Sequence, residues 1–503
     1  MRVDPLFTLA ACVVAAYGQS TFATCLTSAK LSPDAEVVFP SDATYADAIA
    51  VVTLEFSYKP AAVVFLGAPE DATVALQCAA QFGVPTVSRC GRHSYASFSV
   101  GGQDGSLVLD TTKLKAITYD KKTGLATIGL GNRLGDVALA LDSWGRGTPH
   151  GTCASVGTGG HANCGGFGMW SREHGMFLDQ IVKARVATAN GTIVTASHAE
   201  NSDLFWAIRG AGPSFGTVLS ITIKTYAQPS SVVRFNYTFS PITDAGTLVS
   251  FFQNFQAFAA TDAPPPLGIR IVWAPVPWGA LAWVHGVYYG SQTAFLSAVN
   301  PLLTSLPVQP VLAEINNLSY IEAVKAIDTV GQLNSTSQAL QPAYTYYQSV
   351  LVPNEQPLSL QTWTAYVEYA LSNPMPADSL VFTEIDAFAG LYKGRPTAIS
   401  AIPENAAAFS NRNSMLLMQL GSASFIADYT DEMFAWARGW RASITDNVAA
   451  ENKTVKAYGC YVDAKWTAEE AHSIYFGSAK TSKLEKIKRR WDPRRVFNYP
   501  QGF

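Results

Sequence analysis

The chain has 503 residues, more than one hydrophobic core usually organises, so its length predicts two joined domains. With 48% hydrophobic, 12% aromatic and 15% charged residues, the composition excludes a disordered chain, because this much apolar surface can form a large core. The formal net charge of −3 offers no basic surface for nucleic acid or an anionic membrane, and no later stretch is apolar enough to span a bilayer.

The N-terminal residues are typical of a secretory signal peptide. Arg2 precedes an apolar run from Leu6 to Ala16, and the small residues up to Gly18 fit a cleavage site, so residues 1–18 are expected to be removed. A short buried helix is the alternative. Secretion is favoured because Asn-x-Ser/Thr acceptors for N-glycosylation recur downstream, at Asn190, Asn236, Asn317, Asn334 and Asn452.

The first half of the chain predicts short strands separated by a helix and glycine-rich loops. Residues 62–66 form an apolar strand, a helix starts at 69–71 and stops at Gly83, and a second strand covers 84–88. A hairpin is expected over 183–196, because Asn190-Gly191 is a strong turn signal between alternating residues.

After about residue 226 the pattern changes to alternating aromatic strands, such as 269–273 and 282–289, with helices near 248–260 and 428–444. This predicts an antiparallel sheet with helices on one face, and therefore an α+β chain. Near the C-terminus, Thr467 and Glu470 form a capping box, and a helix over 480–491 stops at Asp492-Pro493. The basic cluster on that last helix is interpreted as a solvated face.

Two glycine-dense loops could surround a pyrophosphate. One covers 90–95 and is followed by Gly101-Gly102, and the other covers 151–161 and continues to 165–168. Glycine lets a backbone approach a phosphate closely and leaves N–H groups free to bind it. Neither loop matches the phosphate-binding motif of kinases or the G-x-G-x-x-G fingerprint, which disfavours both of those classes.

Four motifs together point to one family: Arg-x-Gly-x-His-Ser-Tyr at 89–95, His-Gly-Thr-Cys at 150–153, the stretch 203–216, and Trp-Asp-Pro at 491–493. This combination resembles the FAD-linked oxidases of the vanillyl-alcohol-oxidase fold, in the branch similar to berberine bridge enzyme and especially the secreted fungal oligosaccharide oxidases. The resemblance implies an FAD-binding domain over 19–228, a substrate domain with an antiparallel sheet over 229–450, and a C-terminal segment, 451–503, that returns to the FAD domain.

The resemblance also implies how the cofactor is held. By motif position, FAD would be attached twice, through His93 and Cys153, both of them nucleophiles able to add to an electron-poor ring. Val156 would leave dioxygen a route to the flavin, and His161 would serve the loop or the pyrophosphate region. The further residues expected at the cofactor are Arg89, Gly91, Ser94, Gly157, Gly160, Gly216 and Val218.

Catalysis would fall to a tyrosine assisted by a carboxylate. Tyr461 matches the family's C-terminal tyrosine, Asp386 its strand aspartate, and Tyr95 a tyrosine near the reacting sugar. A phenol has a pKa of about 10 and is a poor base alone, so a neighbouring carboxylate has a purpose. Alternation places Glu384 and Asp386 on one strand face. The alternatives are a buried core phenol for Tyr461, a structural hydrogen-bonder for Asp386 and flavin packing for Tyr95.

The expected reaction is oxidation of the reducing-end C1 hydroxyl of an oligosaccharide to the lactone, then the aldonic acid, with O2 reduced to H2O2. Aromatic residues of the second domain, among them Trp273, Trp278 and Trp283, could stack on sugars, and the alternative for these strand residues is a position in the core. Phe167 and Cys460 replace polar family residues, which favours as an alternative the oxidation of a non-carbohydrate alcohol or secondary metabolite. A further alternative is a flavoprotein of feeble activity.

The protein is expected to be an extracellular monomer without a metal, nucleic-acid or membrane partner.

Six cysteines follow the signal segment, and their spacing alone does not reveal how they pair. Cys25 and Cys78 resemble the family's usual disulfide. Cys90 and Cys164 are suggested as a second bridge, because their two loops would line the same cofactor.

Overall fold

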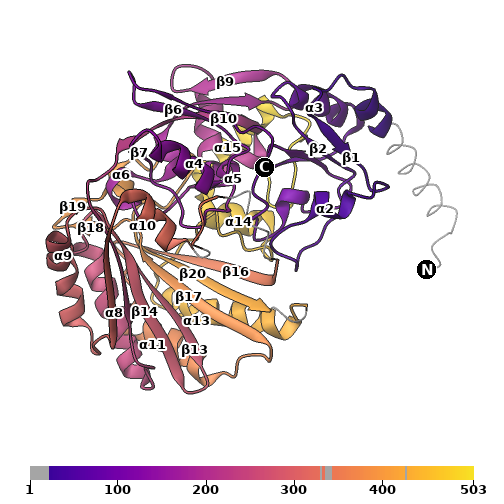
Figure 1. The fold of residues 1–503 in the computed structure, drawn as a ribbon. Coiled ribbons are helices and arrows are strands. Elements are labelled where there is room, and N and C mark those ends of the chain that lie inside the picture. The colour runs from indigo at the N-terminus through magenta and orange to yellow at the C-terminus, as the bar shows by residue number, and fades with distance from the viewer. Residues whose placement is uncertain (1–21, 329–330, 335–341, 425–427) are drawn as a thin grey trace, which may run out of the picture.

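The computed structural model describes residues 22–328, 331–334, 342–424 and 428–503 (Figure 1). The predicted signal segment, 1–18, lies outside these residues. Within the described part of the chain, no helix is long and apolar enough to cross a membrane.

The N-terminal part is built on a small sheet with the strand order β1-β2-β4-β3, in which β2, β4 and β3 run parallel. The predicted strand–helix–strand unit is confirmed, since α3 (Asp71–Phe82) connects β2 to β3 and ends at Gly83, whose φ of 66° suits a residue without a side chain. The strands are β1 (Glu36–Val38), β2 (Ala62–Phe65), β3 (Thr86–Arg89) and β4 (Leu107–Asp110), and a short helix is α2 (Tyr45–Ile49).

A five-stranded antiparallel sheet follows, in the order β5-β6-β10-β8-β9. Its strands are β5 (Ile117–Asp120), β6 (Leu125–Gly129), β8 (Ile181–Ala187), β9 (Ile193–Ser197) and β10 (Thr217–Lys224). The predicted hairpin is β8 and β9, which turn at Asn190-Gly191. The accompanying elements are α4 (Leu134–Asp142), β7 (Arg146–Gly147), α5 (Thr158–Cys164), α6 (Ser171–His174), α7 (Ser202–Ala211) and β11 (Tyr226–Ala227).

The predicted antiparallel sheet has seven strands, ordered β15-β12-β14-β13-β17-β20-β16. They are β12 (Val232–Thr238), β13 (Leu267–Val276), β14 (Gly279–Tyr288), β15 (Leu312–Leu318), β16 (Tyr344–Pro353), β17 (Ser379–Ala387) and β20 (Ser414–Ser424). The helices and short strands of this part are α8 (Ala245–Thr261), α9 (Gln292–Ser305), α10 (Tyr320–Ile327), α11 (Leu360–Ser372), β18 (Leu391–Tyr392), β19 (Arg395–Pro396), α12 (Ala398–Ala401) and α13 (Asp431–Ala450).

Helices α8, α11 and α13 lie along one face of the seven-stranded sheet (Figure 1). The large aromatic core lies between these helices and the sheet. It includes Trp273, whose indole N–H donates to Tyr366 Oη at 2.9 Å. Trp273 is therefore a core residue rather than a sugar-stacking face. Trp278, at the turn between β13 and β14, is 64% exposed. The opposite face of the sheet packs against the N-terminal part of the molecule, because Leu351 on β16 and Leu417 on β20 share a core cluster with residues of that part.

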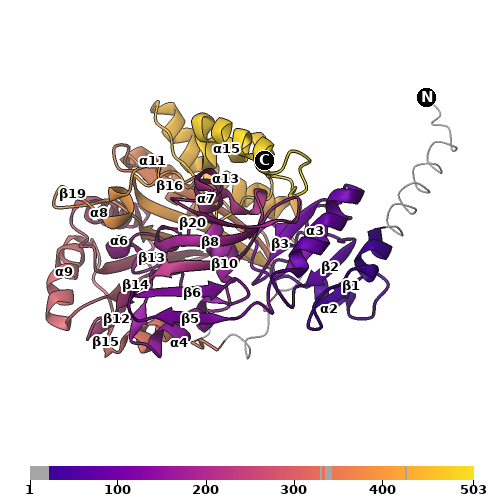
Figure 2. The ribbon, with the colours of Figure 1, turned by 90° about the horizontal axis from the view of Figure 1, so that it is seen from above.

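The C-terminal helices α14 (Ala468–Tyr475) and α15 (Gly477–Trp491) return to the N-terminal half, where α15 packs on α7 (Figure 2). The predicted capping box of Thr467 and Glu470 is present at α14. Thr86 N in β3 donates to Val496 O at 2.7 Å, so the end of the chain extends the first sheet.

Candidate active site

The two glycine-dense loops meet backbone to backbone. A Cβ atom on Gly91 would lie 2.1 Å from Gly157 N, and one on Gly157 would lie 2.2 Å from Gly91 N. Both distances are far below van der Waals contact, so any side chain at either position would force the loops apart. This contact joins the loop that carries His93 to the loop that carries Cys153.

His93 has the properties of a nucleophile rather than of a satisfied core histidine. Its Nε2 is buried and has no hydrogen-bond partner, although buried polar atoms are normally paired. Burial, with a smaller contribution from Arg133, lowers the pKa of His93 to about 4. The imidazole is therefore neutral at ordinary pH, which is its nucleophilic form.

Cys153 is the more accessible of the two thiols in the described residues. Cys90 is buried, its pKa is raised to about 11 by burial, and its thiol donates to Asn132 O at 3.3 Å. Cys153 is only partly buried and interacts electrostatically with Tyr95 and Tyr347. A partly accessible thiol outside the disulfides and an imidazole with an unpartnered Nε2, on adjoining loops, fit the double attachment of a flavin.

The other residues expected at the cofactor divide by what they contact. The buried guanidinium of Arg89 is paired with Asp110, with Nε donating to Oδ2 at 2.7 Å. His161 Nε2 accepts from Gly151 N at 3.0 Å, and burial lowers its pKa to about 3, which supports a structural role in the loop. Gly160 is exposed on α5, and a Cβ there would meet no atom within 4 Å.

The remaining expected cofactor residues lie in the loops and at the start of β10. Ser94 Oγ accepts from Phe98 N at 3.1 Å, and Val156 O accepts from Leu134 N at 2.9 Å. Gly216 directly precedes β10 and Val218 is the second residue of that strand, and a Cβ on Gly216 would be 2.6 Å from Val186 Cγ1.

A charged cluster occupies the open face of the seven-stranded sheet. Arg270 on β13 donates from Nε to Asp386 Oδ1 at 2.8 Å and from Nη1 to Glu384 Oε2 at 2.7 Å. This confirms that Glu384 and Asp386 share one face of β17. Burial would lower the pKa of Arg270, but Asp386 and Glu384 raise it above its ordinary value. The guanidinium is therefore permanently charged.

Asp386 retains one free oxygen. Its side chain is 1% exposed, and Oδ2 has no hydrogen-bond partner. Burial and Glu384 raise the pKa of Asp386 and Arg270 lowers it, which leaves a value of about 6. The carboxylate is thus charged at neutral pH and can accept a proton.

Three tyrosines lie close to this cluster, Tyr95 from the first glycine loop, Tyr347 from β16 and Tyr461 from the C-terminal segment. Tyr95 stacks on Tyr347 with ring centroids 3.9 Å apart, and its hydroxyl accepts from Gln419 Nε2 at 2.9 Å. Tyr461 lies next to it, with a ring-centroid distance of 5.8 Å. Burial, then Tyr95 and Asp386, raise the pKa of Tyr461 well above 10, while Arg270 opposes them. The structure therefore brings Tyr461, Tyr95 and Asp386 together.

No hydrogen bond joins Tyr461 to Asp386 in the described residues. Asp386 instead uses Oδ1 on Arg270, and the two groups interact electrostatically. Arg270, Tyr347 and Gln419 were not predicted from the sequence. A single arginine in the alternating strand 269–273 was the available signal for Arg270, because a charge there must lie on the face away from the core.

The disulfides are Cys25–Cys78, as expected, and Cys164–Cys460. The suggested pair Cys90–Cys164 is wrong. Cys90 lies against the start of α5, where a Cβ on Gly157 would be 2.8 Å from its Sγ, whereas Cys164 ends α5. The two sulfurs therefore face different ends of the same helix.

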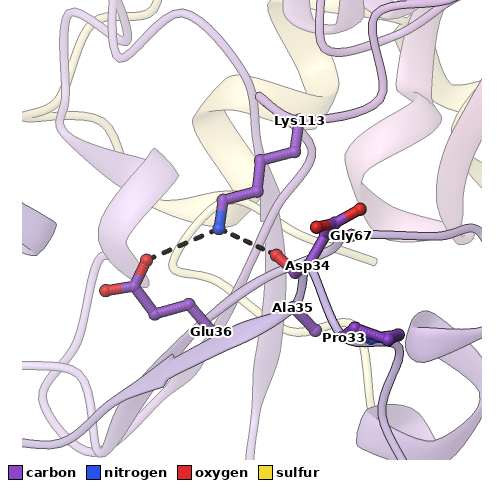
Figure 3. A pocket seen from close by; sticks show the side chains of 6 residues that line it. All are labelled: Pro33, Asp34, Ala35, Glu36, Gly67 and Lys113. Carbon is purple, nitrogen blue, oxygen red and sulfur yellow. Dashed lines mark hydrogen bonds and ion pairs between the residues drawn. The ribbon is translucent and has the colours of Figure 1, made fainter.

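A surface hollow of about 570 Å³ beside β1 is lined by Asp34, Glu36, Gly67 and Lys113 (Figure 3). Lys113 Nζ is bonded to Asp34 O at 2.8 Å and lies 3.5 Å from Glu36 Oε2. None of the residues at the meeting point of the glycine loops lines this hollow.

Two family models match the chain, one described as an FAD binding domain over residues 60–197 and one described as berberine and berberine like over 455–503. The xylooligosaccharide oxidase of Thermothelomyces thermophilus is 32% identical over 450 residues, covering 88% of this chain and 87% of that protein.

Two solved structures cover 96% of this chain and 98% of their own, each with a TM-score of 0.86. One is a xylooligosaccharide oxidase from Myceliophthora thermophila C1 in complex with xylobiose, at 29% identity. The other, at 27% identity, is a glucooligosaccharide oxidase from Acremonium strictum with a 6-S-cysteinyl, 8α-N1-histidyl FAD.

Proposed function

Because this chain belongs to the FAD-linked oxidases similar to berberine bridge enzyme, with the vanillyl-alcohol-oxidase fold, we propose a specific reaction for it. It oxidises the reducing-end C1 hydroxyl of an oligosaccharide to the lactone, which hydrolyses to the aldonic acid, and it reduces O2 to H2O2. The observation that carries this proposal is that Tyr95, two residues after His93 and in electrostatic contact with Cys153, lies beside Tyr461, which in turn interacts with Asp386.

His93 and Cys153 would hold FAD covalently, and the backbone around Gly157 and Gly160 would approach it closely. The chemistry that bound FAD would supply is a two-electron oxidation, in which a hydride would leave the alcohol carbon and both electrons would pass on to O2, which would leave with two protons as H2O2. The unpartnered Nε2 of His93 and the accessible Cys153 support this attachment. Acid-precipitated wild type should remain yellow, and a colourless pellet would refute covalent attachment.

Tyr461 would take the proton of the C1 hydroxyl, and the free Oδ2 of Asp386 would assist it. Arg270 has two effects: it fixes Asp386 through Oδ1, and its positive charge opposes the rise in the pKa of Tyr461. A proton acceptor held within reach of the substrate hydroxyl typically contributes about 10²–10⁴-fold to the rate. Tyr95, fixed by Tyr347 and Gln419, would orient the sugar ring.

A sugar substrate is supported by the polar sheet face and by the substrates that relatives carry in their names. The test is anaerobic flavin reduction by cellobiose, lactose, chitobiose and xylobiose, followed by peroxide release in air. Bleaching by at least one sugar is expected. Failure of all of them, with bleaching by an apolar alcohol, would refute the proposal.

A second candidate is the oxidation of a less polar alcohol. Phe167 is buried against Phe388, with ring centroids 5.1 Å apart, so this position presents no hydroxyl to a sugar. The lack of a Tyr461–Asp386 hydrogen bond supports a third candidate, a flavoprotein of feeble activity. That candidate requires slow flavin reduction with every donor, whereas the second requires fast reduction by the apolar alcohol alone.

We further propose that the protein acts outside the cell as a monomer. Two disulfides support an oxidising compartment. Of the five N-glycosylation acceptors, Asn190, Asn317, Asn334 and Asn452 are exposed, whereas Asn236 is partly buried and donates to Glu314 Oε2 at 3.1 Å. Mass spectrometry of the secreted protein before and after deglycosylation would test the first four sites.

A further inference from the structure

The second disulfide lies beside the proposed catalytic tyrosine. Cys460, the residue before Tyr461, is bonded to Cys164, the last residue of α5 and 296 positions earlier in the chain. Because α5 begins at the meeting point of the two glycine loops, the disulfide connects the segment that carries Tyr461 to the cofactor loops.

Tyr458 also links the segment that carries Tyr461 to the residues that follow α5. Its hydroxyl accepts from Gly166 N at 2.9 Å and Phe167 N at 3.1 Å, just after Cys164. A Cβ on Gly165 would lie 2.6 Å from this hydroxyl oxygen, so a glycine is needed for the close approach. The chain on either side of the disulfide is therefore packed closely.

The segment is also held at its two ends by the seven-stranded sheet. Before the tyrosine, Tyr458 N donates to Ser349 Oγ on β16 at 3.0 Å. After it, the carboxylate of Asp463 accepts from Tyr346 Oη at 2.7 Å and from Gln348 Nε2 at 2.9 Å. These anchors fix residues 458 and 463 but leave the residues between them to other contacts.

Between the anchors, residues 459–462 make one backbone hydrogen bond in the described structure, from Tyr461 N to Tyr458 O at 2.9 Å, and it is internal to the segment. The ring of Tyr461 touches Tyr458 and Tyr95 at centroid distances of 4.9 and 5.8 Å. Each ring contact of this kind contributes about 0.5–1.5 kcal/mol, much less than a covalent bond. The disulfide is thus the strongest link from residues 459–462 to the rest of the molecule.

We propose that Cys164 and Cys460 are positioning residues, whose disulfide holds Tyr461 at the distance from the cofactor loops that proton transfer requires. This inference rests on the proposed function, in which Tyr461 accepts the substrate proton. A displacement of about 1 Å at a reacting group can slow a reaction about 10²-fold. Loss of the link should therefore slow the chemical step and leave sugar binding almost unchanged.

The test compares two double variants. Cys164→Ser with Cys460→Ser removes the positioning disulfide, and Cys25→Ser with Cys78→Ser removes the disulfide between the N-terminal residues and α3. Single-turnover flavin reduction should be about tenfold slower or worse in the first variant, with KM within about twofold of wild type. The control should reduce its flavin at the wild-type rate. An unchanged rate in the first variant would overturn the proposal.

A double-mutant cycle separates positioning from general loosening. In a Tyr461→Phe background, the disulfide should have no further effect on the residual reduction rate, because the group that it positions is absent. Equal slowing in both backgrounds would mean that the disulfide acts on the fold rather than on Tyr461, and would overturn the inference.

Hydrogen exchange gives a readout that does not depend on activity. Amides of residues 458–463 should exchange about tenfold faster in the variant, while those of β20 and α5 keep their rates. If the variant does not fold, reduction of the partly exposed Cys164–Cys460 bond in native wild type replaces it. If none of the tested donors reduces the flavin of wild type, the proposed function fails. The exchange data then still test positioning, because unchanged exchange at residues 458–463 contradicts it.

Discussion

The chemistry of the site depends on the buried carboxylate of Asp386 and on the two side chains that interact with it, Arg270 and Tyr461. Asp386 is bonded to Arg270 through one oxygen and has the other free, and burial raises its pKa to about 6 although Arg270 opposes that rise. Such an arrangement keeps an acceptor charged at neutral pH without saturating it with hydrogen bonds. Tyr461 alone, with its pKa raised by burial, would be a poor base.

The first prediction concerns Tyr461. Tyr461→Phe removes the hydroxyl but keeps the ring contacts with Tyr458 and Tyr95, so the flavin should remain attached and the fold intact. Flavin reduction in a stopped-flow experiment should slow by about 10²–10⁴-fold, the usual contribution of a general base. A rate within twofold of wild type would remove Tyr461 from the mechanism.

The second prediction concerns pH. Because the pKa of Asp386 is about 6 in the folded protein and its ordinary value is 3.8, the reduction rate should fall as pH falls through 6, by about tenfold per unit. The free energy of unfolding should instead rise as pH falls from 6 to 3.8, because in this range the folded state binds the proton of Asp386 more tightly than the unfolded state does. Asp386→Asn should abolish both dependences. A reduction rate that stays flat between pH 7 and 4.5 in wild type would contradict this role.

At the scale of elements, the site is formed where two loops and one sheet face meet. The loops are held together by backbone contact between Gly91 and Gly157. The sheet contributes its open face because Arg270, Glu384 and Asp386 alternate with core residues along β13 and β17. The strands therefore bury one row of side chains against helices and present the next row to the cofactor loops.

The third prediction tests the loop contact. Gly157→Ala places a Cβ 2.2 Å from Gly91 N, so it should lower the free energy of unfolding by about 1–3 kcal/mol and reduce FAD incorporation. Gly246→Ala, in the first turn of α8 where the nearest atom would be 3.4 Å away, is the control and should change stability by about 1 kcal/mol or less. Denaturant unfolding measures both, and equal stabilities would show that the loops can separate freely.

At the scale of the whole molecule, the last residues of the chain complete the N-terminal half. Lys488 on α15 is buried, and its ammonium donates to Ser214 O, Phe497 O and Asp492 Oδ2 at 2.6, 2.6 and 2.8 Å. These bonds connect α15, the loop before β10 and the terminal segment. Removing the ammonium of Lys488 would leave the buried carboxylate of Asp492 without its counter-charge.

The fourth prediction follows from that connection. Lys488→Ala should lower the free energy of unfolding by about 3–5 kcal/mol, because it leaves a buried carboxylate unpaired. Lys486→Ala removes an exposed lysine two residues earlier and should change stability by less than about 0.5 kcal/mol. Unfolding in urea measures both, and equal midpoints would show that the Lys488 contacts contribute nothing.

Local signals in the sequence were enough to predict several helices, strands and turns. The strand–helix–strand unit, the Asn190-Gly191 hairpin, the capping box at Thr467 and the Cys25–Cys78 bond were all predicted and are found. Each of the first three depends on residues a few positions apart, where backbone preferences and hydrophobic periodicity act directly. The fourth came from a resemblance, which also placed His93 and Cys153.

By itself, the sequence predicted His93, Cys153, Tyr461 and Asp386 as the residues that carry the chemistry, because residue types and local motifs can be read directly from the chain. The tertiary structure alone decided what those residues contact: that Arg270 takes one oxygen of Asp386, that no hydrogen bond joins Asp386 to Tyr461 in the described residues, and that Cys164 pairs with Cys460 rather than Cys90. The reason is physical. The two bonded pairs, Arg270–Asp386 and Cys164–Cys460, are 116 and 296 positions apart, so packing of the sheet face against the loops selects them and no local propensity can specify them.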